Sequence, residues 1–182
     1  MKNLTHAFSR TLLLLALIGV AGPLAAQPAV APAFTVTGAA GQEIQFPGEL
    51  EQPTVLLIWA TWCPYCKGLM PHLQSLVDEY GSEGIRVIAV SAFEQEGDPV
   101  AYVAKQGYQF QVVEQGEAIA KKYGVKGVPG VFLVHQGEVR WHLGLARQAE
   151  QRTQGVKGHG RRAVRRAPFW AAELRKALDT LE

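Results

Sequence analysis

The two cysteines of this 182-residue chain, Cys63 and Cys66, stand three positions apart in the run Trp-Cys-Pro-Tyr-Cys. Before this run, residues 55–59 have the unbroken apolar pattern of a buried strand. After it, residues 69–80 carry apolar side chains at helical spacing. The cysteines therefore begin a helix that follows a strand. Residues three apart share one face of a helix, close enough for a disulfide across the first turn. Pro64 suits the first helical position, which needs no backbone N–H.

This placement favours thiol–disulfide exchange. The unpaired N–H groups and the positive dipole end of the helix stabilise a thiolate, so Cys63 is the expected nucleophile. Cys66, one turn further and less exposed, is expected to resolve the mixed disulfide. Two other uses of the pair are weaker. A structural disulfide that closes so short a loop would stabilise little, and a zinc site needs about four ligands, whereas no second cysteine pair exists.

The first 26 residues have the pattern of a secretory signal. Lys2 and Arg10 precede the apolar run 12–21, and Leu-Ala-Ala at 24–26 offers a small-residue cleavage point. An uncleaved membrane anchor is the alternative, whereas the absence of a cysteine near the cleavage point excludes a lipid-modified N-terminus. Export predicts a periplasmic location, an oxidising compartment in which disulfides persist.

The rest of the chain reads as a linker over 27–33 and one globular domain over 34–182. A hydrophobic content of 48% with 19% charged residues fits such a domain. Pro71 falls inside the cysteine helix and is expected to kink it. The predicted strands are 34–37 paired with 43–46, then 54–60, 85–90 and 110–113, and finally 131–135 paired with 138–143. Four helices are predicted: the cysteine helix, which ends near residue 80, and three more over 98–105, 117–123 and 168–181.

Charge is distributed unevenly along the chain. Residues 140–182 hold ten Lys and Arg against four acids, a net charge of +6, whereas the remainder has a net charge of −4. The stretch 147–166 is predicted to be a basic loop, either simply solvated or docking to anionic lipid or an acidic partner. Export argues against nucleic acid as that partner. The arginines proposed for docking are Arg161, Arg162, Arg165 and Arg166.

Four stretches carry a family resemblance. They are 59–66 with the later Pro71, 87–91, the Tyr-Gly-Val-Lys-Gly-Val-Pro run at 123–129, and 131–134 with Gly137. Through them, residues 34–145 resemble the exported thiol–disulfide oxidoreductases of the TlpA/ResA/CcmG type. The resemblance implies an α/β thioredoxin fold, a central mixed sheet flanked by helices. It also implies an N-terminal β-hairpin and a strand–helix insertion within 92–123, and no cofactor besides the redox-active disulfide.

The resemblance also implies roles for individual residues. Pro129 is expected to be cis and to face the cysteines, which leaves the backbone of Val128 to pair with an extended substrate. Trp62 is expected at the rim of the site, with core packing as the alternative. Pro64 and Tyr65, between the cysteines, are expected to contact substrate, but this dipeptide does not indicate the direction of electron flow.

Two acids that relatives use for proton transfer are missing. The buried acid of thioredoxins corresponds to Leu57, and a glutamate found in the ResA-like branch corresponds to Leu69. Such carboxylates assist proton transfer at the resolving thiol. Glu94, just after the 85–90 strand, matches a glutamate of the insertion and is the candidate substitute. A solvated loop acid is the alternative interpretation.

Together these features predict an exported enzyme that reduces disulfides of periplasmic proteins, with cytochrome c maturation as one setting. Because the compartment is oxidising, a membrane protein would have to donate the electrons. Electron flow in the opposite direction, from substrate to protein, as in an oxidase or isomerase, is a close variant of this prediction. A copper chaperone that uses Cys63, Cys66 and a histidine is a more distant alternative.

Overall fold

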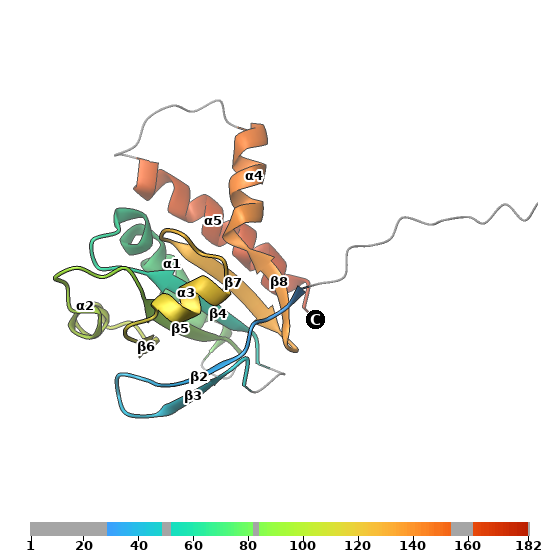
Figure 1. Cartoon of the computed structure of the whole chain (residues 1–182). Coiled ribbons are helices and arrows are strands. Elements are labelled where there is room, and N and C mark those ends of the chain that lie inside the picture. The colour runs from blue at the N-terminus through green and yellow to red at the C-terminus, as the bar shows by residue number, and fades with distance from the viewer. Residues whose placement is uncertain (1–28, 49–51, 82–83, 154–161, 182) are drawn as a thin grey trace, which may run out of the picture.

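The computed structural model describes residues 29–48, 52–81, 84–153 and 162–181, with side chains omitted at 149–153 and 162–164. A six-stranded sheet in the order β1-β8-β7-β4-β5-β6 forms its centre (Figure 1). β4 pairs in parallel with β5 and antiparallel with β7, so the sheet is mixed. The strands are β1 (Ala29–Val30), β4 (Thr54–Trp59), β5 (Arg86–Ser91), β6 (Gln111–Val113), β7 (Gly130–His135) and β8 (Glu138–His142).

Successive residues of β4 supply two separate cores, because side chains of a strand alternate between its faces. All six of its residues are buried. Val55 and Leu57 join one cluster of apolar side chains, whereas Leu56 and Ile58 join the other. This explains the unbroken apolar run in the sequence, since both faces of β4 are covered.

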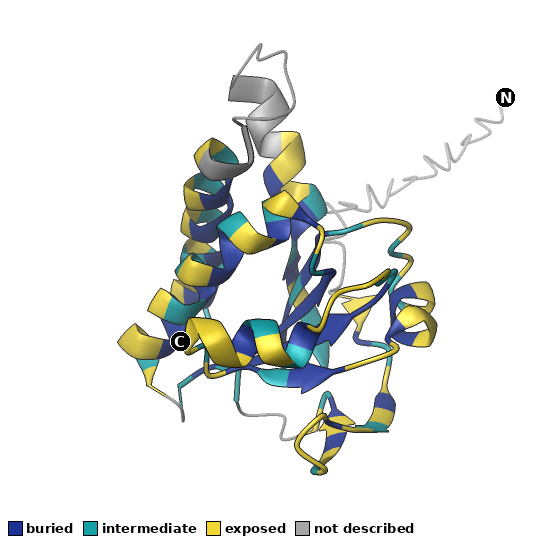
Figure 2. Ribbon diagram, turned by 90° about the vertical axis from the view of Figure 1, so that its left-hand side faces the viewer, coloured by how far each residue is buried: buried dark blue, intermediate teal, exposed yellow. Residues whose placement is uncertain are grey.

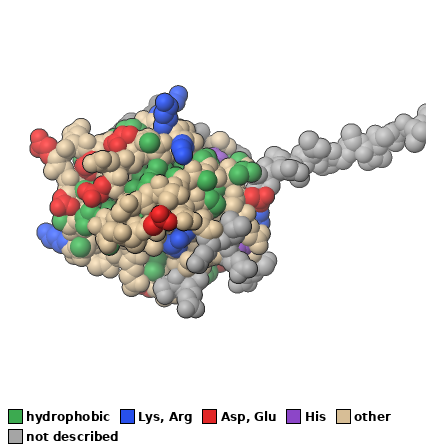
Figure 3. Space-filling view, turned by 60° about the horizontal axis from the view of Figure 1, so that its bottom comes forward, with side chains coloured by type: hydrophobic (Ala, Val, Ile, Leu, Met, Phe, Trp, Pro, Cys, Tyr) green, Lys and Arg blue, Asp and Glu red, His purple; other side chains and the backbone are tan. Residues whose placement is uncertain are grey.

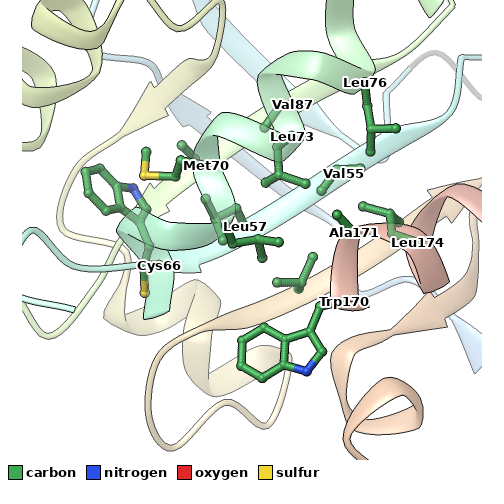
Figure 4. Close-up of a cluster of buried hydrophobic side chains, with 14 of the residues drawn as sticks. Val55, Leu57, Cys66, Met70, Leu73, Leu76, Val87, Trp170, Ala171 and Leu174 are labelled. Atoms are coloured by element: carbon green, nitrogen blue, oxygen red, sulfur yellow. The ribbon is translucent and has the colours of Figure 1, made fainter. Parts of the chain in front are cut away.

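The first face is covered by α1 (Pro64–Tyr80) and α5 (Arg162–Asp179), with α2 (Pro99–Gln106) also contributing to its core. Each helix turns a buried stripe inward and exposes its outer side (Figure 2). Figure 4 shows Leu73 and Leu76 of α1 on the side of the cluster toward Leu174 of α5, whereas Met70 lies toward Cys66. Pro71 lies within α1, as predicted.

The second face is covered by the hairpin of β2 (Phe34–Thr37) and β3 (Glu43–Phe46) and by α3 (Glu117–Lys122). The rings of Phe34 and Phe46 stack at 5.0 Å between centroids, which fixes the hairpin against this core. Seen from the hairpin side, most of the acidic side chains in view lie toward α2 (Figure 3).

Two predicted boundaries are wrong. The predicted linker 27–33 contains β1, in which Ala29 pairs with Val139 and Val30 with Glu138 of β8. The physical reason is that the outer edge of β8 carries unpaired backbone groups, and β1 supplies partners for them. Two exposed residues with no alternating pattern gave no strand signal in the sequence.

The predicted basic loop 147–166 is helical where the structure describes it, over 147–153 and 162–166. α4 (Leu143–Thr153) continues the chain directly from β8, and α5 begins at Arg162 rather than at Pro168, which lies inside the helix. The cause is packing: Ala146 of α4 is buried, and Ala167 extends the buried stripe of α5 past the proline. The free energy gained by burying these side chains thus outweighs the loss of the helical hydrogen bond that Pro168 cannot donate.

The predicted signal over 1–26 lies outside the described residues. None of the helices in the described part of the chain is both long enough and apolar enough to span a membrane.

Candidate functional site

The cysteine pair occupies the N-terminus of α1, as predicted. Cys63 is the N-cap residue in extended conformation, and Pro64 takes the first helical position. The two cysteines form a disulfide with their Cα atoms 5.3 Å apart. The backbone N–H of Cys66 donates to Sγ of Cys63 at 3.1 Å, so this sulfur occupies the place of a capping oxygen. A thiolate formed there would be held by the same N–H.

Both cysteines are buried in this disulfide form. Cys63 is 2% exposed and Cys66 0%, so the expected difference in exposure between nucleophile and resolving thiol is small here. Cys66 belongs to the same buried cluster as Leu57 and lies at the edge of the group drawn in Figure 4. Leu57 and Leu69, at the two positions where the family resemblance implies acids, are buried in this cluster, so the surroundings of the resolving sulfur are apolar.

Glu94 braces the turn that leads to the cysteines. Its carboxylate accepts hydrogen bonds from the backbone N–H of Thr61 at 2.8 Å and from the Thr61 hydroxyl at 2.6 Å. Ser91 and the backbone of Gln95 donate to it as well, each at 3.2 Å. Burial raises the pKa of Glu94, but these hydrogen bonds outweigh it and hold the pKa below its usual value. The geometry gives Glu94 a positioning role, and proton transfer through it stays a prediction.

Trp62 lies at the rim of the site. It is 49% exposed, which excludes core packing as its main role. Its indole N–H donates to the carbonyl of Phe93 at 2.8 Å, and the N–H of Phe93 donates to the carboxylate of Glu117 at 3.0 Å. Phe93 has a φ of 61°, an unusual conformation for a side chain of this size that these two bonds hold. Trp62 is thereby held in place while its ring faces solvent.

The second half of the site is the loop before β7. The Val128–Pro129 peptide bond is cis, as predicted. Gly130 begins β7 opposite Ile58, near the end of β4 from which the cysteine turn departs. A Cβ at Gly130 would lie 2.7 Å from Cγ2 of Val125, so glycine is required for this close packing. Val128 packs against both core clusters.

Two residues from α4 and α5 join the halves of the site, and the sequence did not reveal this role. Nη2 of Arg147 donates to the carbonyl of Pro129 at 3.2 Å, and its guanidinium lies 5.5 Å from the ring centroid of Trp170. Trp170 in turn lies 6.0 Å from the ring of Tyr65, between the cysteines. Trp170 is buried on α5, but no local signal in the sequence links residues more than a hundred positions apart.

Metal binding was the other possible use of the cysteines. In the described parts of the chain, no three side chains of His, Cys, Asp or Glu gather closely enough to hold a metal ion.

Comparison with known proteins identifies relatives that are named thiol-disulfide oxidoreductases. The model of the AhpC/TSA family matches residues 29–142. The thiol-disulfide oxidoreductase ResA of Halalkalibacterium halodurans is 35% identical over 115 residues, which cover 61% of this chain and 65% of that protein. ResA of Bacillus thuringiensis is 30% identical over 127 residues, 69% of this chain and 73% of that protein.

Solved structures of similar proteins share the fold of this chain. StoA of Bacillus subtilis superimposes with a TM-score of 0.52 at 26% identity, covering 63% of this chain and 89% of that chain. A thiol:disulfide interchange protein of the thioredoxin family from Chlorobium tepidum superimposes with a TM-score of 0.58 at 21% identity, covering 65% and 86%. The match over more than half of the sequence and the shared fold place this chain in the AhpC/TSA family of thioredoxin-fold proteins.

Proposed function

We propose that this protein is an exported thiol–disulfide oxidoreductase that reduces disulfides in other proteins through Cys63 and Cys66. The observation that carries the proposal is the Cys63–Cys66 disulfide at the N-terminus of α1, in a fold that also presents a cis Val128–Pro129 bond before β7. The names of two relatives, the thiol-disulfide oxidoreductase ResA and the sporulation thiol-disulfide oxidoreductase A of Bacillus subtilis, support the same class of reaction.

The reaction starts from the reduced pair. The Cys63 thiolate attacks one sulfur of the substrate disulfide, so a Cys63–substrate disulfide forms and the second substrate sulfur leaves as a thiolate that takes up a proton. Cys66 then gives up its proton and attacks the Cys63 sulfur, which releases the first substrate sulfur as a thiol. Two electrons and two protons have then passed to the substrate, and the protein holds the Cys63–Cys66 disulfide.

Substrate recognition would use the rim around the pair. The backbone of Val128 would pair with an extended substrate segment, as strands add to exposed peptide groups. Trp62 offers a large exposed ring held by the Phe93 carbonyl, and Tyr65 lies between the cysteines against Trp170. In this proposal all three residues contact the substrate, and none takes part in the electron transfer.

The proposed setting is the periplasm, with a membrane protein as electron donor and cytochrome c maturation as one use. The pattern of residues 1–26 supports export. Of the four arginines proposed to dock an acidic partner or anionic lipid, the described side chains are those of Arg165, which is exposed, and Arg166, which is half-buried, both on α5. Arg161 lies outside the described residues.

The first test is the reduction potential of the Cys63–Cys66 pair, measured by equilibrating the protein with glutathione buffers. A value near about −270 mV, that of thioredoxin, supports a reductant, whereas a value near about −120 mV, that of DsbA, would reverse the proposed direction.

The second test uses insulin reduction. Cys63→Ala should abolish it, and Cys66→Ala should accumulate a mixed disulfide on Cys63, because attack remains possible while resolution does not. Undiminished insulin reduction by Cys63→Ala would refute the exchange mechanism in both directions.

A further inference from the structure

A groove runs beside the cis-proline loop. It has a volume of about 470 Å³ and lies between the loop 124–132 and the junction of β8 with α4, where residues 142–144 and Arg147 form its other wall. Val128, Pro129 and Gly130 line it, so it begins where the proposed substrate segment would pair with the protein. The cysteines do not line it, so it is distinct from the exchange centre.

The second wall of the groove depends on α4. The family match ends at His142, and α4 begins at the next residue. Arg147 fixes this wall to the cis-proline loop through its hydrogen bond to the Pro129 carbonyl. At Gly144, a Cβ would lie 2.8 Å from the imidazole of His142, so the glycine lets this ring lie against the start of α4.

The two charged side chains of the groove are both basic. Lys126 and Arg147 are exposed on opposite walls, and the half-buried His142 lies on the wall of Arg147. Among the described residues that line the groove there is no Asp or Glu. The remaining surface consists of small and apolar side chains and backbone. The surface therefore complements a short extended peptide that carries a carboxylate.

We propose that this groove binds the residues next to the reacting cysteine of the substrate protein, and that Lys126 and Arg147 favour Asp or Glu there. This rests on the proposed exchange function. A strand that pairs with the Val128 backbone advances about 3.3 Å per residue, so positions within about three residues of the substrate cysteine reach the groove. The positive charges then contribute selectivity, whereas the exchange chemistry remains with the cysteines.

The test uses pairs of short peptides that differ only in Glu or Gln at one position within three residues of a single cysteine. Each cysteine carries a thionitrobenzoate group in a mixed disulfide. The reduced protein releases one coloured thiol per peptide and becomes oxidised at Cys63–Cys66. At the position facing the groove, the Glu peptide should react in this single turnover with a second-order rate constant about twofold to fivefold higher, the range of an exposed ion pair. Raising the salt to about 1 M, where the Debye length is about 3 Å, should erase the preference.

Lys126→Gln should reduce the Glu preference, and the double variant Lys126→Gln/Arg147→Gln should abolish it. Lys121→Gln is the matched control, because this exposed lysine of α3 lies outside the groove; it should keep the full preference. Equal rates for Glu and Gln at every position would overturn the inference, as would a preference that survives the double variant. Failure of the wild type to react with any peptide and with insulin would instead overturn the exchange function itself.

Discussion

The brace formed by Glu94 can be tested through stability. In Glu94→Gln the amide nitrogen cannot accept, so at least one of the hydrogen bonds from Ser91 and the Thr61 backbone and hydroxyl is lost. A hydrogen bond to a charged group contributes about 1.5–3 kcal/mol, and the site is only part-buried, so the variant should lose about 1–2 kcal/mol of unfolding free energy. For a chain of this size, that lowers Tm by about 2–8 °C.

The pH dependence makes this prediction specific. The folded-state pKa of Glu94 lies below the ordinary value of 4.5. The stability that its carboxylate contributes is therefore complete above about pH 4.5 and is lost as the pH falls through the lower folded-state value. The gap in unfolding free energy between wild type and Glu94→Gln should accordingly be constant at neutral pH and narrow in acid, as measured by urea unfolding.

Glu96→Gln provides the matched control, since Glu96 is exposed and the substitution removes the same charge two residues along the chain. It should change stability by less than about 0.5 kcal/mol. Thr61→Val removes the hydroxyl donor, and combining it with Glu94→Gln should cost less than the sum of the two single changes. If Glu94→Gln were as stable as Glu96→Gln, or if the two effects simply added, Glu94 would not brace the turn.

Three further outcomes are expected. Leu73→Ala, at a fully buried position of α1, should lower the free energy of unfolding by about 2–5 kcal/mol in denaturant unfolding. Leu145→Ala, at a position 44% exposed, should change it by less than about 0.5 kcal/mol, and equal effects would contradict the assigned core. The hydrogen bond to Asp179, together with burial, raises the pKa of Tyr80 to about 12, so in an ultraviolet titration Asp179→Asn should shift one tyrosine to lower pH, and Tyr80→Phe should remove that transition. In the insulin assay, Arg147→Gln should slow reduction by up to about fivefold, because the Pro129 carbonyl loses its hydrogen bond, and the reduction potential of the Cys63–Cys66 pair should stay unchanged. A changed potential would instead mean that Arg147 acts on the cysteines themselves.

The two halves of the candidate site differ in how far the sequence revealed them. The cysteine half follows from local rules: an apolar strand, a proline at the first helical position and two cysteines one turn apart. The cis bond before Pro129 has no such local cause and was predicted only through the family resemblance. The hydrogen bonds that hold the cysteine half, between Glu94 and Thr61 and between Trp62 and Phe93, join segments about thirty residues apart, so no pattern in a short window could indicate them.

The sequence by itself determined the order of the elements from β2 to β8, the two-sided burial of β4 and the position of Cys63 at a helix start, because hydrophobic period and capping chemistry act over a few neighbouring residues. The tertiary structure decided that β1 completes the edge of β8 and that α5 begins before Pro168. It also decided that Arg147 and Trp170 tie the cis-proline loop to Tyr65. These features depend on which backbone groups are left unpaired and which surfaces are left uncovered once the sheet has formed, and those conditions exist only in the folded chain.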